Sequence, residues 1–146
     1  MTNMLAVPSG KIKIVLIDDD DVDAMGVERS LNKLKFVDEI VRATDGHEAL
    51  DLLLHTDVTK HPYIILLDLN MPRMNGFEFL EQLREHPLLS GSVVFVLSTS
   101  NDQQDKLKAY KKQIAGFIVK DKFKLGYQPL IDLLTSYYTL IDLPAF

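Results

Sequence analysis

The chain has 146 residues, of which 47% are hydrophobic and 25% charged, as is typical of one globular domain with a single core. Its formal net charge is −5, which argues against general binding of nucleic acids, and no apolar run approaches the roughly 18 residues of a membrane span. The lack of cysteine excludes disulfides, zinc fingers and thiol nucleophiles. Because no signal peptide is recognisable either, we expect a cytoplasmic protein.

Residues 1–10 are predicted to form a flexible arm, and we expect one domain over residues 11–146, with residues 141–146 as a C-terminal extension. Within it, short apolar runs alternate with helical patterns. The first strand, 11–17, precedes a helix with Ala24, Val27, Leu31 and Leu34 on one face. The later segments are predicted in this order: strand 39–44, helix 48–55, strand 63–67, helix 75–86, strand 92–97, helix 102–112, strand 116–119 and a helix from about residue 129.

This strict alternation predicts βαβ units and an open parallel sheet with helices on both faces, a doubly wound α/β fold. The runs YIILL and SVVFVL are apolar throughout, as strands buried on both faces should be. In such a sheet, ligands bind at the carboxyl ends of the strands.

Polar residues follow four of the predicted strands, so we expect them to meet at one edge of the sheet. They are Asp18-Asp19-Asp20, Asp68, Ser98-Thr99-Ser100 and Lys120. Carboxylates packed this closely repel one another unless a cation joins them. Mg²⁺ is the expected cation, because it binds through one or two carboxylates and phosphate oxygens. A carboxylate there can attack phosphorus and form an aspartyl phosphate, with Lys120 and Ser98 as partners of the transferred group.

Four segments resemble receiver domains of response regulators, in order and in spacing. They are IVLIDDDD (14–21), ILLDLNMPRMNGFEFL (65–80), VFVLSTS (94–100) and GFIVK (116–120). The resemblance covers about residues 11–140. It implies a CheY-like, flavodoxin-like fold with five parallel strands in the order 2-1-3-4-5.

The resemblance also implies residue roles. Asp68 would be the phosphoacceptor and a Mg²⁺ ligand, and Asp18 and Asp19 would hold the ion together with the backbone carbonyl of Asn70. The remaining acidic residues of the run 18–23 are expected at the start of a helix, where the dipole favours them.

Three further residues would respond to the phosphoryl group. Ser98 would bond its oxygen, an assignment preferred over Thr99 by counting from the end of the apolar run. Lys120 would pair with its charge, and Phe117 would be the rotamer switch. Most receivers have proline after this lysine, but this chain has Asp121, so we expect a different loop path there.

These features predict a stand-alone response regulator that accepts a phosphoryl group from a sensor histidine kinase and is not itself an enzyme beyond self-dephosphorylation. A phosphatase using an aspartyl phosphate is disfavoured, because Asn70 stands where such enzymes need a second acid. A calcium loop starting at Asp19 fails, because Ala24 and Ser30 replace its Gly and Glu. The remaining alternative is a receiver-like module that binds partners without phosphate.

The last predicted helix carries more apolar residues than one face can use: Leu130, Ile131, Leu133, Leu134, Tyr137, Tyr138, Leu140 and Ile141. The simple explanation is a wide core face. We prefer a homodimer through the face formed by strand five and this helix, with residues 142–146 lying on the partner. The acidic start, the end of strand four and the extra C-terminal residues resemble the small stand-alone regulators paired with bacterial phytochrome kinases. We expect neither nucleic acid nor a membrane among the partners of this chain.

Overall fold

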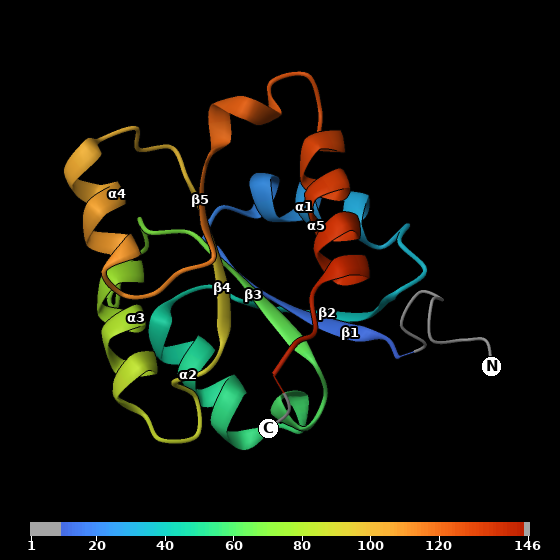
Figure 1. Ribbon diagram of the computed structural model, residues 1–146. Helices are drawn as coiled ribbons and strands as arrows, with labels where there is room; N and C mark the ends of the chain where they lie inside the picture. Colours follow the sequence, from blue (N-terminus) through green and yellow to red (C-terminus); the bar gives the residue numbers. More distant parts are fainter. Residues whose placement is uncertain (1–9, 145–146) are drawn as a thin grey trace.

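The computed structural model describes residues 10–144 (Figure 1). It contains a five-stranded parallel sheet with the order β2-β1-β3-β4-β5, which confirms the predicted doubly wound, flavodoxin-like α/β fold. The strands are β1 (Ile12–Ile17), β2 (Val37–Ala43), β3 (Tyr63–Leu67), β4 (Val93–Ser98) and β5 (Gly116–Val119). The α-helices are α1 (Asp21–Leu31), α2 (Gly46–His55), α3 (Gly76–Glu85), α4 (Gln103–Tyr110) and α5 (Gln128–Leu140), with short 3₁₀ helices η2 (Val58–Lys60) and η3 (Lys120–Phe123).

The predicted arm lies outside the described residues except for Gly10, and so do the last two residues of the predicted C-terminal extension. Among the described helices, none combines the length and the apolar content that crossing a membrane would require.

Side chains of the central strands alternate between two cores, one on each face of the sheet. On one face, residues such as Val15, Leu67 and Val96 pack with α2, α3 and α4. On the other, residues such as Leu16 and Leu66 pack with α1 and α5. Figure 1 shows these two helical layers on either side of the sheet. Each strand end therefore has neighbours on two faces, and alternate residues beyond it can reach different helices.

Several element boundaries differ from the predictions because side chains cap the helices. The second helix starts at Gly46, earlier than predicted, because the buried Asp45 carboxylate accepts a hydrogen bond from the N–H of Glu48 at 2.9 Å. Asn75 is the cap of α3 rather than its first residue, in a capping box with Glu78. The second strand also starts earlier, because Val37 already pairs with Ile12 of β1.

Gly76 begins α3 where the chain passes very close to the end of β3. A Cβ built on Gly76 would lie 2.6 Å from the Cα of Leu69 and 2.7 Å from the carbonyl oxygen of Asp68. Both contacts are with backbone, which cannot move aside as a flexible side chain can. Glycine therefore lets α3 pack directly against the residue that ends the central strand.

We expect Gly76→Ala to lower the free energy of unfolding by about 1–3 kcal/mol, as overpacking typically does. Urea denaturation of both proteins measures the difference. Gly10→Ala is the matched control, because nothing lies within 4 Å of a Cβ at Gly10, and we expect it to change stability little. Equal stability of Gly76→Ala and wild type would contradict the close packing described here.

Candidate functional site

The carboxyl ends of β1 and β3 bring two aspartates together at one edge of the sheet. The N–H of Asp18 donates to the carbonyl of Ala43 at 3.0 Å, and the N–H of Asp68 donates to that of Ile17 at 2.8 Å. Sheet hydrogen bonding thus continues through both residues. One carboxylate oxygen from each of Asp18, Asp19 and Asp68 lies within 4.8 Å of the others. The structure therefore brings together the three carboxylates that the sequence singles out.

This donor set fits a small divalent cation. Asp18 and Asp68 are buried and Asp19 is exposed, so the cluster opens to solvent on one side. Three carboxylate oxygens are the hard ligands that Mg²⁺ prefers, with room for water or phosphate at the remaining positions. The fourth predicted ligand, Asn70, lies on the exposed loop after β3, and its N–H donates to Oδ1 of Asp68 at 3.3 Å.

The charge of Asp68 is strongly affected by its surroundings. Burial raises the pKa of Asp68 to about 6, opposed by the nearby Lys120 and supported by the negative charges of Asp18 and Asp19. A bound cation would favour the ionised form, which is the nucleophilic one.

Lys120 follows β5 and reaches the acidic cluster from the side of α1. Its Nζ lies 3.1 Å from Oδ2 of Asp18 and 2.9 Å from Oδ2 of Asp23. Burial alone would lower the pKa of Lys120, but the hydrogen bond to Asp23 and the charges of Asp68 and Asp18 outweigh it and raise this pKa. The lysine is therefore a permanent cation beside Asp68.

Ser98 ends β4 and is fully buried, whereas its neighbour Thr99 is exposed. The Ser98 hydroxyl accepts a hydrogen bond from the N–H of Ser100 at 3.0 Å. Ser98 thus lies inside the protein at the same edge of the sheet as Asp68, while Thr99 points towards the α1 side, where it lines a cavity with Lys120.

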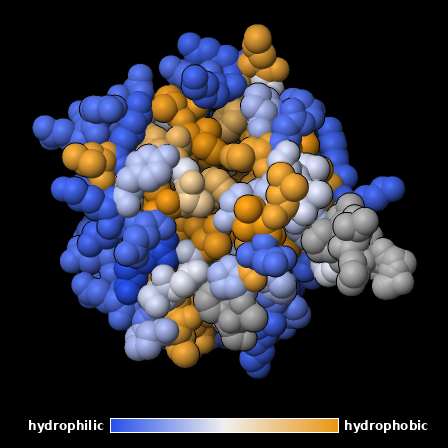
Figure 2. Space-filling model, viewed as in Figure 1, coloured by the Kyte–Doolittle hydropathy of each residue, from blue (hydrophilic) through white to orange (hydrophobic). Residues whose placement is uncertain are grey.

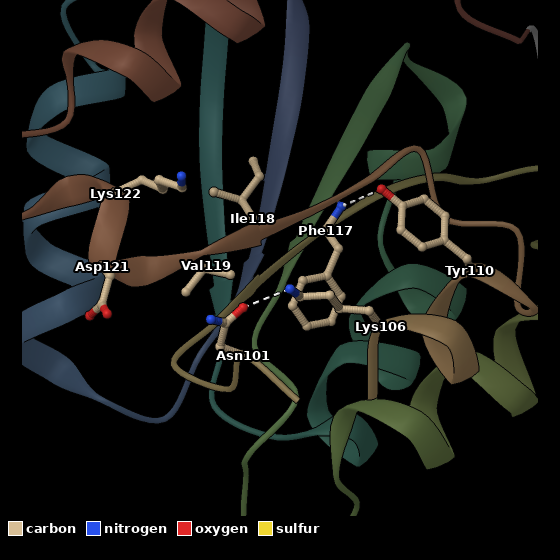
Figure 3. Close-up of a pocket in the computed structure, with 8 residues that line it drawn as sticks. All are labelled: Asn101, Lys106, Tyr110, Phe117, Ile118, Val119, Asp121 and Lys122. Atoms are coloured by element: carbon tan, nitrogen blue, oxygen red, sulfur yellow. Dashed lines mark hydrogen bonds between the residues drawn. The ribbon is translucent and has the colours of Figure 1, made fainter. Parts of the chain in front are cut away.

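Phe117 lies in β5 on the same face of the sheet as Ser98. In the register between β4 and β5, Val96 pairs with Phe117 and Ser98 with Val119. The Phe117 side chain is half-buried against the core under α2, α3 and α4. The backbone N–H of Phe117 donates to the hydroxyl of Tyr110 at 3.2 Å. Phe117 also lines a groove of about 640 Å³ between α4 and β5 (Figure 3).

Two arginines that the sequence analysis does not single out hold the loops of the site. Nε and Nη2 of Arg42 donate to the carbonyl of Asp18 at 3.1 and 3.0 Å, and Nη1 pairs with Asp21 at 2.8 Å. Arg73, with a φ of 60°, pairs with the buried Asp45. These contacts join β2 to the acidic loop and the loop after β3 to the cap of α2. Sequence separations of 24 and 28 residues give no local signal for them.

Comparison with known proteins finds a family that covers most of the chain. Residues 14–125 match the family model of the response regulator receiver domain. The nitrate/nitrite response regulator protein NarL of Escherichia coli K12 is 39% identical over 108 residues, which are 74% of this chain and 47% of NarL. The chain thus spans about half the length of this relative.

Two solved structures resemble the chain over almost their whole length. The phosphorylated cyanobacterial phytochrome response regulator RcpA is 27% identical, with a TM-score of 0.75 over 92% of this chain and 99% of RcpA. The Mn²⁺-bound form of response regulator Rcp1, a protein of Synechocystis, is 25% identical, with a TM-score of 0.72 and the same two coverages, 92% and 99%.

We expect Asp68→Asn to stabilise the metal-free protein at pH 7. The pKa of Asp68 is raised from 3.8 to about 6 in the folded state, so ionising it disfavours folding. The loss of folding free energy that ionised Asp68 causes is absent below about pH 4, grows as pH rises towards 6, and then stays at about 1–3 kcal/mol. Urea denaturation in EDTA between pH 4 and pH 7 should show the variant's advantage growing with pH.

Asp142→Asn is the control, because Asp142 is exposed beyond α5. It should show no such growth. If the free energies of unfolding of Asp68→Asn and wild type differed by a constant amount across this pH range, burial would not disfavour the ionised form of Asp68.

Proposed function

This chain belongs to the response regulator receiver domain family, and we propose that it is a stand-alone phosphoacceptor switch that receives a phosphoryl group from a sensor histidine kinase on Asp68. The observation that carries the proposal is the buried Asp68 carboxylate, clustered with Asp18 and Asp19 and flanked by Lys120. The likeness to the phosphorylated response regulator RcpA supports the proposal as well.

In the proposed transfer, a carboxylate oxygen of Asp68 attacks the phosphorus of a phosphohistidine. The P–N bond breaks, its electron pair stays on the imidazole nitrogen, and an acyl phosphate forms on Asp68. Lys120 supplies a fixed positive charge beside the phosphoryl oxygens, and Ser98 supplies a hydroxyl donor. Mg²⁺ held by Asp18, Asp19, Asp68 and the Asn70 carbonyl would neutralise the developing negative charge.

The same residues couple the phosphoryl group to the surface. The Ser98 hydroxyl accepts a hydrogen bond from Ser100, and donating to a phosphoryl oxygen would move this end of β4. Phe117 faces the same side two residue pairs earlier, opposite Val96, so a shift of Ser98 would change the space beside its ring. We propose that Phe117 turns inward then, which reshapes the groove between α4 and β5. The phosphoryl group would shift the balance between two conformations only by the difference in its interaction free energy with each of them.

We propose a phytochrome-related histidine kinase as the donor, acting in the cytoplasm, where kinases obtain ATP. The likeness to RcpA, a phytochrome response regulator, supports this choice. Nucleic acid and membrane are not among the proposed partners, given the net charge of −5.

We also propose that a second copy of the chain binds the face formed by β5 and its flanking helices. Figure 2 shows apolar side chains gathered over β5 between α4 and α5, surrounded by hydrophilic surface. Tyr110, Phe117, Ile118 and Val119 line the groove there. Such an apolar centre with a charged rim is typical of a protein interface.

The last helix, α5, offers less apolar surface to a partner than its sequence predicts. Five of the eight apolar residues at the end of the chain pack into this chain's own core: Leu130, Ile131, Leu134, Tyr137 and Tyr138. Leu133, Leu140 and Ile141 remain exposed. Leu143 also packs against the same core, which argues against the prediction that residues 142–146 lie on the partner, although 145 and 146 are outside the described residues. The dimer proposal therefore rests on the groove between α4 and β5.

Asp68→Asn should fold normally but take no label from a phosphorylated histidine kinase, because an amide cannot form the acyl phosphate. Mg²⁺ with beryllium fluoride, a phosphoryl mimic, should raise the melting temperature of the wild type only. Asp121→Asn, on the exposed start of η3, is the control and should respond like wild type.

Labelling retained by Asp68→Asn would place the acceptor elsewhere. No response of the wild type to beryllium fluoride would favour the alternative function, a receiver-like module that binds its partner without phosphate.

For the dimer, light scattering with Mg²⁺ and beryllium fluoride should give twice the monomer mass for the wild type. Tyr110→Asp should reduce dimerisation about tenfold or more, because it places a charge in the apolar groove. Leu88→Asp adds the same charge at a site that is 70% exposed and outside the groove, and should dimerise normally. A wild type that stays monomeric both with and without Mg²⁺ and beryllium fluoride would rule out the interface.

A further inference from the structure

The ammonium group of Lys120 has a partner that lies outside the carboxylate cluster. Asp23 Oδ2 is 2.9 Å from Nζ, closer than Oδ2 of Asp18 at 3.1 Å. The Lys120 side chain is 15% exposed and that of Asp23 38% exposed, so the pair is partly shielded from water. Lys120 is thus held between the acidic cluster and α1.

Asp23 is presented by a rigid element. It lies in the first turn of α1, and its N–H donates to the Asp20 side chain, the cap of this helix, at 3.0 Å. One turn later, α1 touches the segment after η3, since a Cβ at Gly26 would meet the Tyr127 hydroxyl at 2.7 Å. The packing of α1 against this segment therefore brings Asp23 and Lys120 together.

The segment that carries Lys120 is a 3₁₀ helix with no side-chain cap. Asp121 stands here in place of the proline of most receivers, and it is exposed. The ion pair with Asp23 ties the start of η3 to α1. Beside the pair lies a cavity of about 220 Å³, lined in part by Phe123 and Tyr127, which leaves Lys120 room to move.

We propose that Asp23 is a positioning residue that holds Lys120 in the unphosphorylated state and competes for it with the phosphoryl group on Asp68. This inference rests on the proposed function. A full hydrogen bond between Lys120 and a phosphoryl oxygen draws the ammonium group towards Asp68, away from α1. The contact between Asp23 and Lys120 then exists mainly in the unphosphorylated state. Because it stabilises that state alone, it lowers the affinity of the protein for a phosphoryl group or its mimic.

The test is the affinity for beryllium fluoride at saturating Mg²⁺, measured from the concentration dependence of the melting temperature. Asp23→Asn should bind it about two- to fivefold more tightly than wild type, as expected for loss of one partly exposed ion pair. Asp121→Asn is the matched control, because it removes the same charge next to Lys120 from a side chain with no contact to its ammonium group. Its affinity should stay near that of wild type.

Asp23→Glu keeps the carboxylate and should bind close to wild type, which a purely structural role of the aspartate would not predict. Equal gains in Asp23→Asn and Asp121→Asn would overturn the proposal and leave only a general charge effect. Weaker binding by Asp23→Asn would also overturn it, since Asp23 would then present Lys120 to the phosphoryl group. Failure of the wild type to bind at all would instead reject the phosphoacceptor function on which the inference rests.

Discussion

Mutual repulsion among three carboxylates at the edge of the sheet is the constraint on which the rest of the site depends. Asp18, Asp19 and Asp68 lie within 4.8 Å of one another, where each charged pair repels by about 3 kcal/mol at an effective dielectric constant of about 20. Parallel strand pairing holds Asp18 and Asp68 side by side, because backbone hydrogen bonds continue through both residues. The site must therefore gain positive charge or keep a proton, and both a cation and the raised pKa of Asp68 answer this need.

The doubly wound fold gives this edge access to both helical layers. Ser98 and Phe117 face the core beneath α4, whereas Lys120 reaches across to α1. A phosphoryl group on Asp68, as proposed, would thus act on two faces of one sheet through two different side chains. The alternation of strand residues that builds the two cores also separates these two routes, so the same pattern serves folding and signalling.

Much of this site can be predicted from the sequence because its residues directly follow apolar strands. Asp68 and Ser98 are located by where YIILL and SVVFVL end, and the sheet geometry brings them to one edge. The contacts of Arg42, Arg73 and Asp23 could not be predicted in this way. Each depends on where a loop or helix lies relative to a distant element, such as the 97 residues that separate Asp23 from Lys120. Helix starts were misplaced by one or two residues because caps such as Asp45 act through side-chain geometry.

In the unphosphorylated state, each group expected to bind a phosphoryl oxygen already has another partner. The Ser98 hydroxyl oxygen accepts a hydrogen bond from the N–H of Ser100, and the Lys120 ammonium group contacts Asp18 and Asp23. The Asp68 carboxylate, the proposed acceptor, itself accepts a hydrogen bond from the N–H of Asn70. These contacts are individually weak, since a hydrogen bond exchanged for another changes the free energy by about 1 kcal/mol. Their exchange can therefore be driven by one added phosphoryl group and reversed when it leaves. Stronger partners would hold the protein in one state. Without any partner, the buried polar groups would be left unsatisfied. A reversible switch at this edge of the sheet therefore requires weak alternative contacts.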